Sequence, residues 1–300
     1  KRQGPADFLR TLRCAHQADC ILIQKKLFSQ WKLRLLVRAA PLIFDMDDAS
    51  FATSRFELES YAPRKARRRT SRRQRRLAAV LTRSRRVIAG NGYLADYARR
   101  FAHDVVVVPT AVDLSAYPRH RLTDKPDTGV TIGWIGSSPS LPYLAQLRDP
   151  LARIFARFKN VRMVQICDAF AELPGVPCAQ RQWSLDREPE DLLSLDIGLM
   201  PLTDDPFARG KCALKILQYF AAGAAVVCSP VGANLEVASD PDTALFASSA
   251  EEWESHIARL IEHPPLRRAM RNRAREVVEK AYSAEVVGPR LAELIQSVKH

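Results

Sequence analysis

The stretch from Asp196 to Val227 reads DIGLMPLTDDPFARGKCALKILQYFAAGAAVV. Its two ends belong to continuous apolar runs, Ile197–Leu202 and Ala225–Pro230, which are typical of strands buried on both faces of a parallel sheet. Between them a polar loop leads into a helical segment at Lys211–Ala222. A strand, a helix and a second strand in this order predict the βαβ unit of an α/β fold.

The same alternation runs through the rest of the chain. Further apolar runs predict strands at Cys20–Gln24, Leu42–Asp47, Val87–Asn91, Val105–Thr110, Val130–Gly136, Val161–Cys167 and Ala244–Ala247. Further helices are predicted at Leu141–Lys159, Glu251–Ile261, Pro265–Tyr282 and, as an amphipathic segment, Glu285–Ser297. Ligands of α/β folds bind at the carboxyl ends of the strands, so polar residues that follow a strand are the candidates for a site.

The 300 residues are enough for two domains, each with its own core. A mostly polar stretch with two prolines, Asp113–Gly129, separates two series of strands and helices and predicts the boundary. We therefore expect a first domain at 1–118, a second at 119–282, and a helix at 283–300 that crosses back to the first domain.

Charge is concentrated in one segment. The chain carries 46 Lys and Arg residues against 33 Asp and Glu residues, a net charge of +13. Twelve of the basic residues and no acidic one lie between Arg64 and Arg86, so the rest of the chain is nearly neutral. This argues against a generally basic nucleic-acid coat and indicates a local contact with an anion, the alternative being a solvated basic helix or loop. The expected contact residues are Arg67, Arg68, Arg69, Arg72, Arg73, Arg75 and Arg76.

Cysteine and hydropathy patterns place further bounds on the class of protein. The six cysteines form no C-x-x-C pair and have no metal-ligand spacing with the six histidines, which fits a reducing cytoplasm and predicts neither a metal nor another cofactor. No apolar run approaches the roughly 18 residues that span a bilayer, and no signal-peptide pattern opens the chain. We therefore expect a cytoplasmic protein.

The strand predicted at Leu42–Asp47 runs into three carboxylates, Asp45, Asp47 and Asp48. Like charges this close raise one another's pKa, so the cluster needs a reason. A metal, contacts with sugar hydroxyls or acid–base chemistry would supply one, and a metal is disfavoured because no second acidic cluster or histidine partner is evident. The alternative is a helix N-cap, in which Asp47 or Asp48 accepts backbone N–H bonds.

Two further strand ends carry glycine and polar residues. Gly136 and Ser137 follow the strand predicted at Val130, and a helix begins soon after them, so this loop is either a phosphate-binding loop or a structural turn. It has neither the G-x-G-x-x-G spacing of a dinucleotide fold nor a P-loop. After the strand predicted at Ala225, Gly232, Asn234 and Glu236 offer backbone amides and a carboxylate to a ligand, or ordinary helix capping.

The loop and helix of the opening stretch form a candidate anion cradle from Arg209, Lys211 and Lys215. On the predicted helix Lys211 and Lys215 are four residues apart and share a face. Lysines at a helix start oppose the helix dipole, which favours a bound anion as the explanation. The alternative is a pair of solvated lysines on an exposed face.

In this order, these segments resemble the retaining GT-B glycosyltransferases, in particular the large group (family 4, group 1) that contains sucrose and mannosyl transferases. Val105–Asp113 is similar to the end of the family's first domain, and Ile132–Ser137 is similar to the first strand and loop of its nucleotide-sugar domain. Asp196–Gly232 is similar to the donor-binding signature, and Leu266–Tyr282 to the usual tail. The ordered set covers nearly the whole chain.

The resemblance implies an α/β fold of the GT-B type, with two Rossmann-like domains facing a cleft. The family's opening strand and glycine-rich loop are absent before Gly4, so the first domain is expected to be incomplete. The implied activity is metal-independent transfer of a sugar from a nucleotide-sugar donor, with retention of configuration. Lys211 and Lys215, with Arg209, would stabilise the leaving diphosphate. Amides at Gly136 and Ser137 and the helix start after Gly232 would complete the donor site.

The sequence departs from the family pattern at two places. The family's E-x7-E pair falls on Gly210 and Gln218. Gln218 keeps an oxygen and an amide for the ribose hydroxyls, whereas Gly210 has no side chain to contact the sugar. The family's sugar-contacting histidine falls near Asp47, where a carboxylate would accept sugar or acceptor hydroxyls.

The departures leave two alternatives to an active transferase. One is a weak or inactive GT-B scaffold that serves binding or assembly. The other is a nucleic-acid binder that uses the arginine tract, which is disfavoured because no aromatic residues interleave with the arginines for base stacking. For a transferase, the tract lies in the acceptor-side domain and favours a lipid-linked acceptor, an acidic glycan or an anionic membrane surface, with the protein associated peripherally with the membrane.

Overall fold

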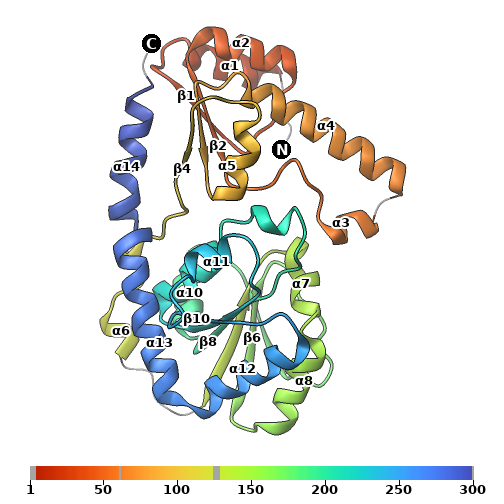
Figure 1. Cartoon of the computed structure of the whole chain (residues 1–300), viewed down its shortest axis with the longest axis vertical. Helices are drawn as coiled ribbons and strands as arrows, with labels where there is room; N and C mark the ends of the chain where they lie inside the picture. The colour runs from red at the N-terminus through yellow and green to blue at the C-terminus, as the bar shows by residue number, and fades with distance from the viewer. Residues whose placement is uncertain (1–4, 61, 124–128, 299–300) are drawn as a thin grey trace. The chain divides into compact units, whose positions relative to one another are not determined.

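The computed structural model describes residues 5–60, 62–123 and 129–298. Two compact units make up the chain (Figure 1). The first comprises Lys1–Thr110, Asp205–Cys212 and Val287–His300, and the second comprises Ala111–Asp204 and Ala213–Val286. Part of the predicted boundary stretch, residues 124–128, lies outside the described residues.

The first unit is built on a four-stranded parallel sheet in the order β1-β2-β3-β4. Figure 1 shows α1 and α2 together at one end of this unit and α4 as a long helix that extends away from the sheet. The apolar side chains of the strands and of one face of each of α2, α4 and α5 form a single core. The strands are Ile21–Gln24 (β1), Leu42–Met46 (β2), Arg86–Ala89 (β3) and Val105–Val107 (β4). The helices are Pro5–Ala15 (α1), Gln30–Ala39 (α2), Arg55–Ser60 (α3), Pro63–Leu81 (α4) and Gly92–Arg99 (α5), with a 3-10 turn at Ala208–Gly210 (η3).

The second unit holds a six-stranded parallel sheet in the order β10-β9-β8-β5-β6-β7. Its strands are Val130–Ile135 (β5), Val161–Cys167 (β6), Cys178–Gln182 (β7), Ile197–Met200 (β8), Ala225–Cys228 (β9) and Ala244–Phe246 (β10). The chain adds strands outward from β5 on one side and from β8 on the other, which is the Rossmann strand order. The neighbouring strands β5 and β8 therefore flank the topological switch point, where α/β folds bind ligands.

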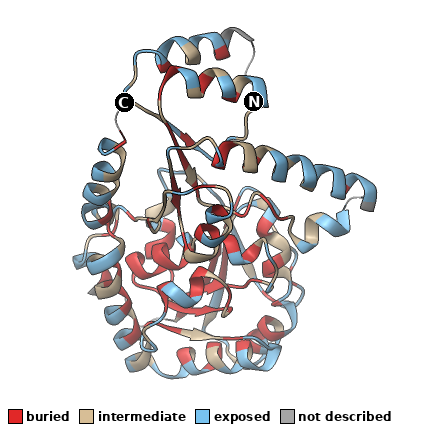
Figure 2. Ribbon diagram, turned by 45° about the horizontal axis from the view of Figure 1, so that its top comes forward, coloured by how far each residue is buried: buried red, intermediate tan, exposed pale blue. Residues whose placement is uncertain are grey.

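Helices cover the second sheet on both faces, with α8 packed against α12 and α10 packed against α9 and α13. Figure 2 shows this sheet as the buried centre of its unit. The helices are His120–Thr123 (α6), Leu141–Ala145 (α7), Arg148–Arg157 (α8), Glu188–Leu193 (α9), Leu214–Ala222 (α10), Ala233–Val237 (α11), Ala250–Glu262 (α12) and Pro264–Val277 (α13). Helix Ala284–Gln296 (α14) begins in the second unit, and its residues from Val287 onward belong to the first. Three further turns lie at Leu114–Ala116 (η1), Ser138–Ser140 (η2) and, with π geometry, Val278–Tyr282 (η4).

All nine strands predicted from apolar runs are present. The two parallel sheets and their helices confirm the α/β fold class. A tenth strand, β7, was missed because its residues CAQRQ are mostly exposed at the edge of the sheet. The helix expected at Leu141–Lys159 is two helices, and the arginine tract is helical.

A buried arginine holds the end of the second unit together. Arg275 on α13 is only 5% exposed. Its guanidinium donates to the carbonyls of Tyr117 and Ala221 at 2.8 and 2.6 Å and to the Glu279 carboxylate at 2.8 Å. These bonds join the segment that enters the unit, the end of α10 and the last turns of α13.

Candidate functional site

Three of the predicted acidic residues lie at the carboxyl end of β2, and a lysine that follows β1 joins them. The Lys25 ammonium lies 2.8 Å from an Asp47 oxygen and 3.2 Å from an Asp48 oxygen. Lys25 adopts a positive φ of 57°, an uncommon conformation for a residue with a side chain. Asp45 accepts a hydrogen bond from Gln24 on the neighbouring strand at 3.0 Å. The helix-cap alternative has no support here, because these carboxylates face Lys25 and Gln24.

The three carboxylates of this acidic cluster have different electrostatic surroundings. Burial, with the nearby Asp47 carboxylate, raises the pKa of Asp45. The Asp47 and Asp48 side chains share the Lys25 charge, and one Asp47 oxygen is buried without a hydrogen-bond partner among the described residues. A buried acceptor left open in this way suits a hydroxyl group that a ligand would bring.

The segment Asp205–Cys212 packs onto the acidic cluster within the first unit. The Cys212 thiol donates to the Asp47 carbonyl at 3.2 Å, and Asn91 donates its side-chain amide to the Lys211 carbonyl at 3.1 Å. Burial and the Asp47 and Asp48 carboxylates raise the pKa of the Cys212 thiol to about 12, so this cysteine stays protonated. Burial also lowers the pKa of Lys211, with the Asp48 carboxylate acting in the opposite direction. The structure therefore places Lys211 near Asp48, and its neighbour Cys212 against the Asp47 carbonyl.

The same packing explains the glycine at position 210. A Cβ atom there would lie 2.4 Å from the Ala49 Cβ and 2.9 Å from the Ala49 backbone nitrogen. No side chain fits without moving the backbone that follows Asp48. The glutamate of the resembling family is thus excluded sterically as well as missing.

The predicted shared helical face of Lys211 and Lys215 is wrong. Helix α10 begins at Leu214, and Ala213 before it has left-handed angles, φ 52° and ψ 22°. Lys211 is extended, with φ −73° and ψ 141°. A helix that included Lys211 would break the contacts of the Asp205–Cys212 segment with Asp47 and Asn91, so the helix starts later. Arg209 is exposed in η3.

In the second unit, the loop after β5 is shaped by Trp134. A Cβ on Gly136 would lie 2.2 Å from the Trp134 ring, so only glycine fits there. The Gly136 amide donates to the Ile166 carbonyl at 3.0 Å, which corrects the expectation that this amide faces a ligand. Ser137 follows, and its amide makes no hydrogen bond within the described residues. Ser138 donates from its amide and hydroxyl to Asp168 after β6, at 2.6 and 2.9 Å.

Lys215 lies in the first turn of α10, beside the same loop. Its ammonium sits 4.9 Å from the centre of the Trp134 ring. The contact is a cation–π interaction that fixes a flexible side chain at the switch point. The Tyr219 hydroxyl donates to the Leu199 carbonyl and accepts from the Ile135 amide, both at 3.1 Å, and so ties β5 to β8 below the lysine. The switch point thus has a rigid floor and a positive charge, to which the helix N-terminus adds.

Gln218 is 9% exposed and donates its amide to Glu188 of α9 at 2.7 Å. Glu188 also accepts from the Trp183 indole nitrogen at 2.6 Å. A carboxylate, that of Glu188, therefore lies within hydrogen-bond distance of the position at which the family pattern has a glutamate. Trp183 remains 41% exposed at the end of β7.

Of the predicted site residues after β9, Gly232 and Asn234 maintain the turn, and Glu236 is exposed. Gly232 has φ 55° and ψ −134°, a conformation that requires glycine. Asn234 is 1% exposed and donates to the Ser229 carbonyl at 2.9 Å, so its side-chain amide serves the turn, as the capping alternative expects. Glu236 is exposed on α11.

Helix α4 carries the predicted arginine contacts and is exposed along most of its length (Figure 2). Arg69 and Arg73 pair with Glu57, and Arg76 contacts the Leu27 carbonyl. Arg67 lines a separate, mostly apolar groove with Phe51, Leu58 and Pro206. Arg68 and Arg75 are exposed on the helix, and Arg72, also exposed, lies beside Arg76 and Leu27.

Sequence reasoning missed five residues that complete these clusters: Lys25, Asn91, Trp134, Asp168 and Glu188. Lys25 and Asp168 directly follow strands, so the rule that found the acidic cluster applied to them too. Trp134 and Glu188 act through contacts with residues about 80 and 30 positions away, which no local pattern reveals.

Neither a metal-ligand group nor a membrane-spanning helix is found in the described part of the chain. Within it, no three His, Cys, Asp or Glu side chains are grouped so that they would hold a metal ion. Within residues 5–60, 62–123 and 129–298, no helix combines the length and apolar character needed to cross a bilayer.

Known proteins share this architecture. The glycosyl transferase-like family model matches residues 193–293. Among solved structures, HepE from Anabaena in complex with UDP and glucose has a TM-score of 0.71 at 14% identity, covering 97% of this chain and 82% of its own. Sucrose-phosphate synthase from Thermosynechococcus elongatus has a TM-score of 0.76 at 15% identity, covering 97% and 77%. Trehalose 6-phosphate synthase from Burkholderia multivorans has 0.66 at 14%, covering 99% and 76%. No curated protein matches the sequence.

The resemblance to the GT-B glycosyltransferases is confirmed. The chain has the fold of these enzymes over nearly its whole length, and the residues that match the glycosyl transferase-like family model include β8, β9 and α10.

Proposed function

We propose that this protein transfers a sugar from a nucleotide-sugar donor to an acceptor, with retention of configuration and without a metal. The observation that carries the proposal is Lys215, held 4.9 Å from the Trp134 ring centre at the switch point of the Rossmann-ordered sheet. HepE, which shares the fold, holds UDP and UDP-glucose in its structures. UDP-glucose is therefore the first donor to test.

Cleavage of the bond between the sugar and the diphosphate leaves negative charge on the diphosphate oxygen. A fixed cation and a helix N-terminus aimed at that oxygen stabilise the transition state more than the ground state. Lys215 and the first turn of α10 supply this field, with the Ser137 amide beside them. Lys211 and Arg209 lie just before α10 in the chain and are assigned to the same diphosphate. This charge stabilisation does the work that a metal does in other transferases.

The second unit also offers groups for the rest of the nucleotide. Glu188 and Gln218 are assigned to the ribose hydroxyls, because the carboxylate oxygens accept hydrogen bonds and the glutamine holds Glu188 in place. The turn at Gly232, with Glu236, is assigned to the donor sugar. Asn234 supports that turn through its bond to Ser229.

The first unit is the acceptor side in this proposal. Asp45, Asp47 and Asp48 are assigned to acceptor or sugar hydroxyls, and the unpartnered Asp47 oxygen supports this role. The cations of α4, beside an apolar groove of about 470 Å³ lined by Phe51, Leu58 and Pro206, favour a lipid-linked acceptor over an acidic glycan. An exposed row of arginines also fits peripheral attachment of a cytoplasmic protein to an anionic membrane surface.

The test is release of the free nucleotide from UDP-, GDP- and ADP-sugars, followed with and without EDTA. We expect release from at least one donor, unchanged by EDTA, and a product whose anomeric configuration by NMR equals that of the donor. Inversion would contradict retention, and loss of activity with EDTA would contradict metal independence.

Two alternatives predict other outcomes, which binding measurements beside the release assay distinguish. A weak or inactive GT-B scaffold would bind a nucleotide sugar without releasing the nucleotide; the missing side chain at Gly210 is the feature that favours it. A nucleic-acid binder would show steeply salt-dependent binding to nucleic acid and no response to nucleotide sugars.

A further inference from the structure

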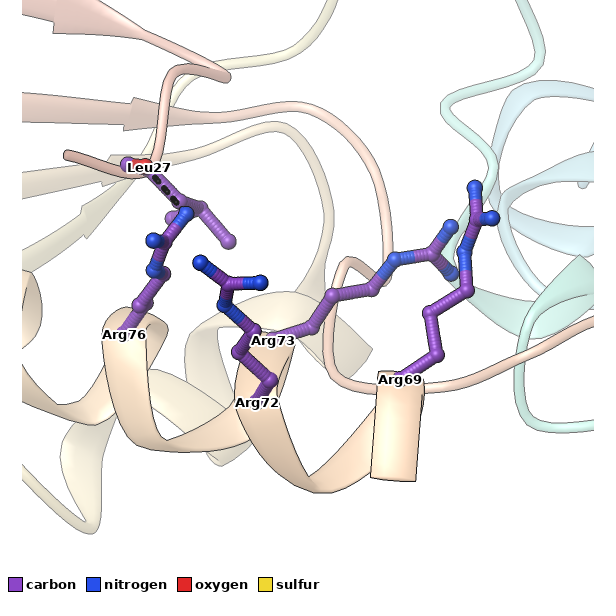
Figure 3. A pocket seen from close by; sticks show the side chains of 5 residues that line it. All are labelled: Leu27, Arg69, Arg72, Arg73 and Arg76. Carbon is purple, nitrogen blue, oxygen red and sulfur yellow. Dashed lines mark hydrogen bonds between the residues drawn. The ribbon is translucent and has the colours of Figure 1, made fainter. Parts of the chain in front are cut away.

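Four arginines of one helix surround a cavity at the side of α4. Arg69, Arg72, Arg73 and Arg76 line it together with Leu27, and its volume is about 660 Å³ (Figure 3). Figure 3 shows the Arg72 and Arg76 guanidinium groups turned toward the Leu27 side, while Arg69 and Arg73 reach the other way along the helix. The cavity belongs entirely to the first unit.

The four arginines that line the cavity differ in their partners. Arg73 binds both oxygens of Glu57, at 3.1 and 3.3 Å, and Arg69 lies 3.3 Å from the same carboxylate. Arg76 makes one long hydrogen bond, 3.5 Å, to the Leu27 carbonyl. Arg72 has no partner among the described residues, and each guanidinium carries five N–H donors. On the Leu27 side, Arg72 and Arg76 therefore carry N–H donors that no hydrogen bond within the described residues uses.

Placing these four arginines together on α4 is electrostatically unfavourable. Arg69, Arg72, Arg73 and Arg76 are three and four residues apart, spacings at which like charges on a helix repel. The first turn of α4 contains no acidic residue to offset the charge. An anion bound among the four arginines would offset their mutual repulsion.

The cavity also has a defined place in the fold. Leu27 stands two residues after Lys25, which contacts Asp47 and Asp48. On the other side of α4, Gln74 donates to the Phe51 carbonyl at 2.9 Å, in the segment that follows β2. The helix is thus fastened to both chain segments that leave the carboxyl ends of β1 and β2, where α/β folds bind ligands.

We propose that this cavity is a binding site for a phosphate ester, held by Arg72 and Arg76 and bordered by Arg69 and Arg73. Guanidinium groups recognise phosphate oxygens in pairs of parallel hydrogen bonds, a geometry that a diffuse row of lysines does not supply. The site lies one short loop away from the acidic cluster, so the phosphate belongs to the acceptor. That last assignment rests on the proposed function, whereas phosphate binding itself does not.

The direct test is calorimetric titration with inorganic pyrophosphate and with sn-glycerol 3-phosphate. The variant is Arg72→Gln/Arg76→Gln, which keeps helix propensity and removes the unused donors. The matched control is Arg64→Gln/Arg85→Gln, which removes the same charge from residues of the basic tract that do not line the cavity. We expect about a tenfold loss of affinity in the first variant and a change within about twofold in the control.

Vesicle binding distinguishes a lipid headgroup from a soluble ester as the source of the phosphate. Phosphatidylcholine vesicles that contain either phosphatidic acid or an equal charge of phosphatidylglycerol differ in offering a phosphate monoester. If the phosphate is a lipid headgroup, wild-type protein and control prefer phosphatidic acid and the cavity variant loses the preference. If only the soluble esters discriminate between the variants, the phosphate belongs to a soluble acceptor.

Equal losses in both double variants, or no binding by the wild-type protein, would overturn the site. UDP-glucose binding and circular dichroism are measured on the same samples. Retained donor binding with no phosphate binding rejects this inference alone, and phosphate binding without donor binding rejects the proposed function alone.

Discussion

Position 210 shows how a single residue links the fold to the site. Its Cβ would meet both the side chain and the backbone of Ala49, so the loop that carries Lys211 packs onto the acidic cluster only with glycine there. The two described non-glycine residues with positive φ, Lys25 and Ala213, also belong to the candidate clusters. Such conformations cost energy and persist where surrounding contacts hold them.

Gly210→Ala is expected to lower the free energy of unfolding by about 1–3 kcal/mol, because the backbone of Ala49 must move. Gly288→Ala on α14 is the control, since nothing lies within 4 Å of its new Cβ, and it should stabilise the protein by up to about 1 kcal/mol. Urea denaturation measures both. Equal stability of the Gly210→Ala variant and the wild type would show that the close packing is not maintained in solution.

Asp45 gives a pH-dependent prediction. Burial and the Asp47 carboxylate raise its pKa above the ordinary 3.8, so the folded protein holds this proton more tightly than the unfolded chain. The contribution of this group to stability is therefore greatest below pH 3.8 and falls as the pH rises through the folded-state pKa. Asp45→Asn keeps an acceptor for Gln24, so the variant should be more stable than the wild type at neutral pH. The difference should vanish in acid. A less stable variant at pH 7 would contradict the assignment.

Among the elements, α13 depends on a buried charge. Arg275→Leu leaves the carbonyls of Tyr117 and Ala221 without a donor and should lower the free energy of unfolding by about 2–4 kcal/mol. Arg273→Leu, two residues away, removes an ion pair with Asp240 whose arginine is 47% exposed, and should cost less than about 1 kcal/mol. Similar losses in the two variants would mean that Arg275 is not the link between these elements.

The elements also show what sequence reasoning can reach. Apolar strands such as β8 and β9 are recognisable because a parallel sheet buries both of their faces. The edge strand β7 is polar and gives no such signal. The late start of α10 is set by the contacts of Lys211 and Cys212 with Asn91 and Asp47, more than a hundred residues away, which local propensity does not encode.

The residues of the candidate site likewise differ in whether the sequence predicts them. Asp47, Asp48 and Lys215 were found because they stand at strand ends or a helix start. Trp134, which holds Lys215, looks like an ordinary core residue in the sequence. Glu188 reaches Gln218 only through the tertiary fold.

At the scale of the whole molecule, the excess charge of +13 belongs almost entirely to α4 and the residues just after it. Arg68→Gln/Arg75→Gln should therefore weaken binding to phosphatidylglycerol vesicles by roughly ten- to thirtyfold, at about 1 kcal/mol for each arginine. Arg153→Gln/Arg157→Gln on α8 removes the same charge and should have an effect within about twofold. Vesicle flotation distinguishes them. Equal effects would show that net charge, and not α4, attracts the surface.

The central claim is that the switch point of the second sheet binds a nucleotide sugar through Lys215. Calorimetric titration of UDP-, GDP- and ADP-glucose tests it most directly, with the wild-type protein, Lys215→Ala and Lys159→Ala. Lys159 is the control because it lies just before β6, at the opposite end of the strands. We predict that Lys215→Ala weakens binding about tenfold or more, about 1.4 kcal/mol, while Lys159→Ala binds like the wild type. Equal affinity of wild type and Lys215→Ala, or no binding at all, would contradict the account.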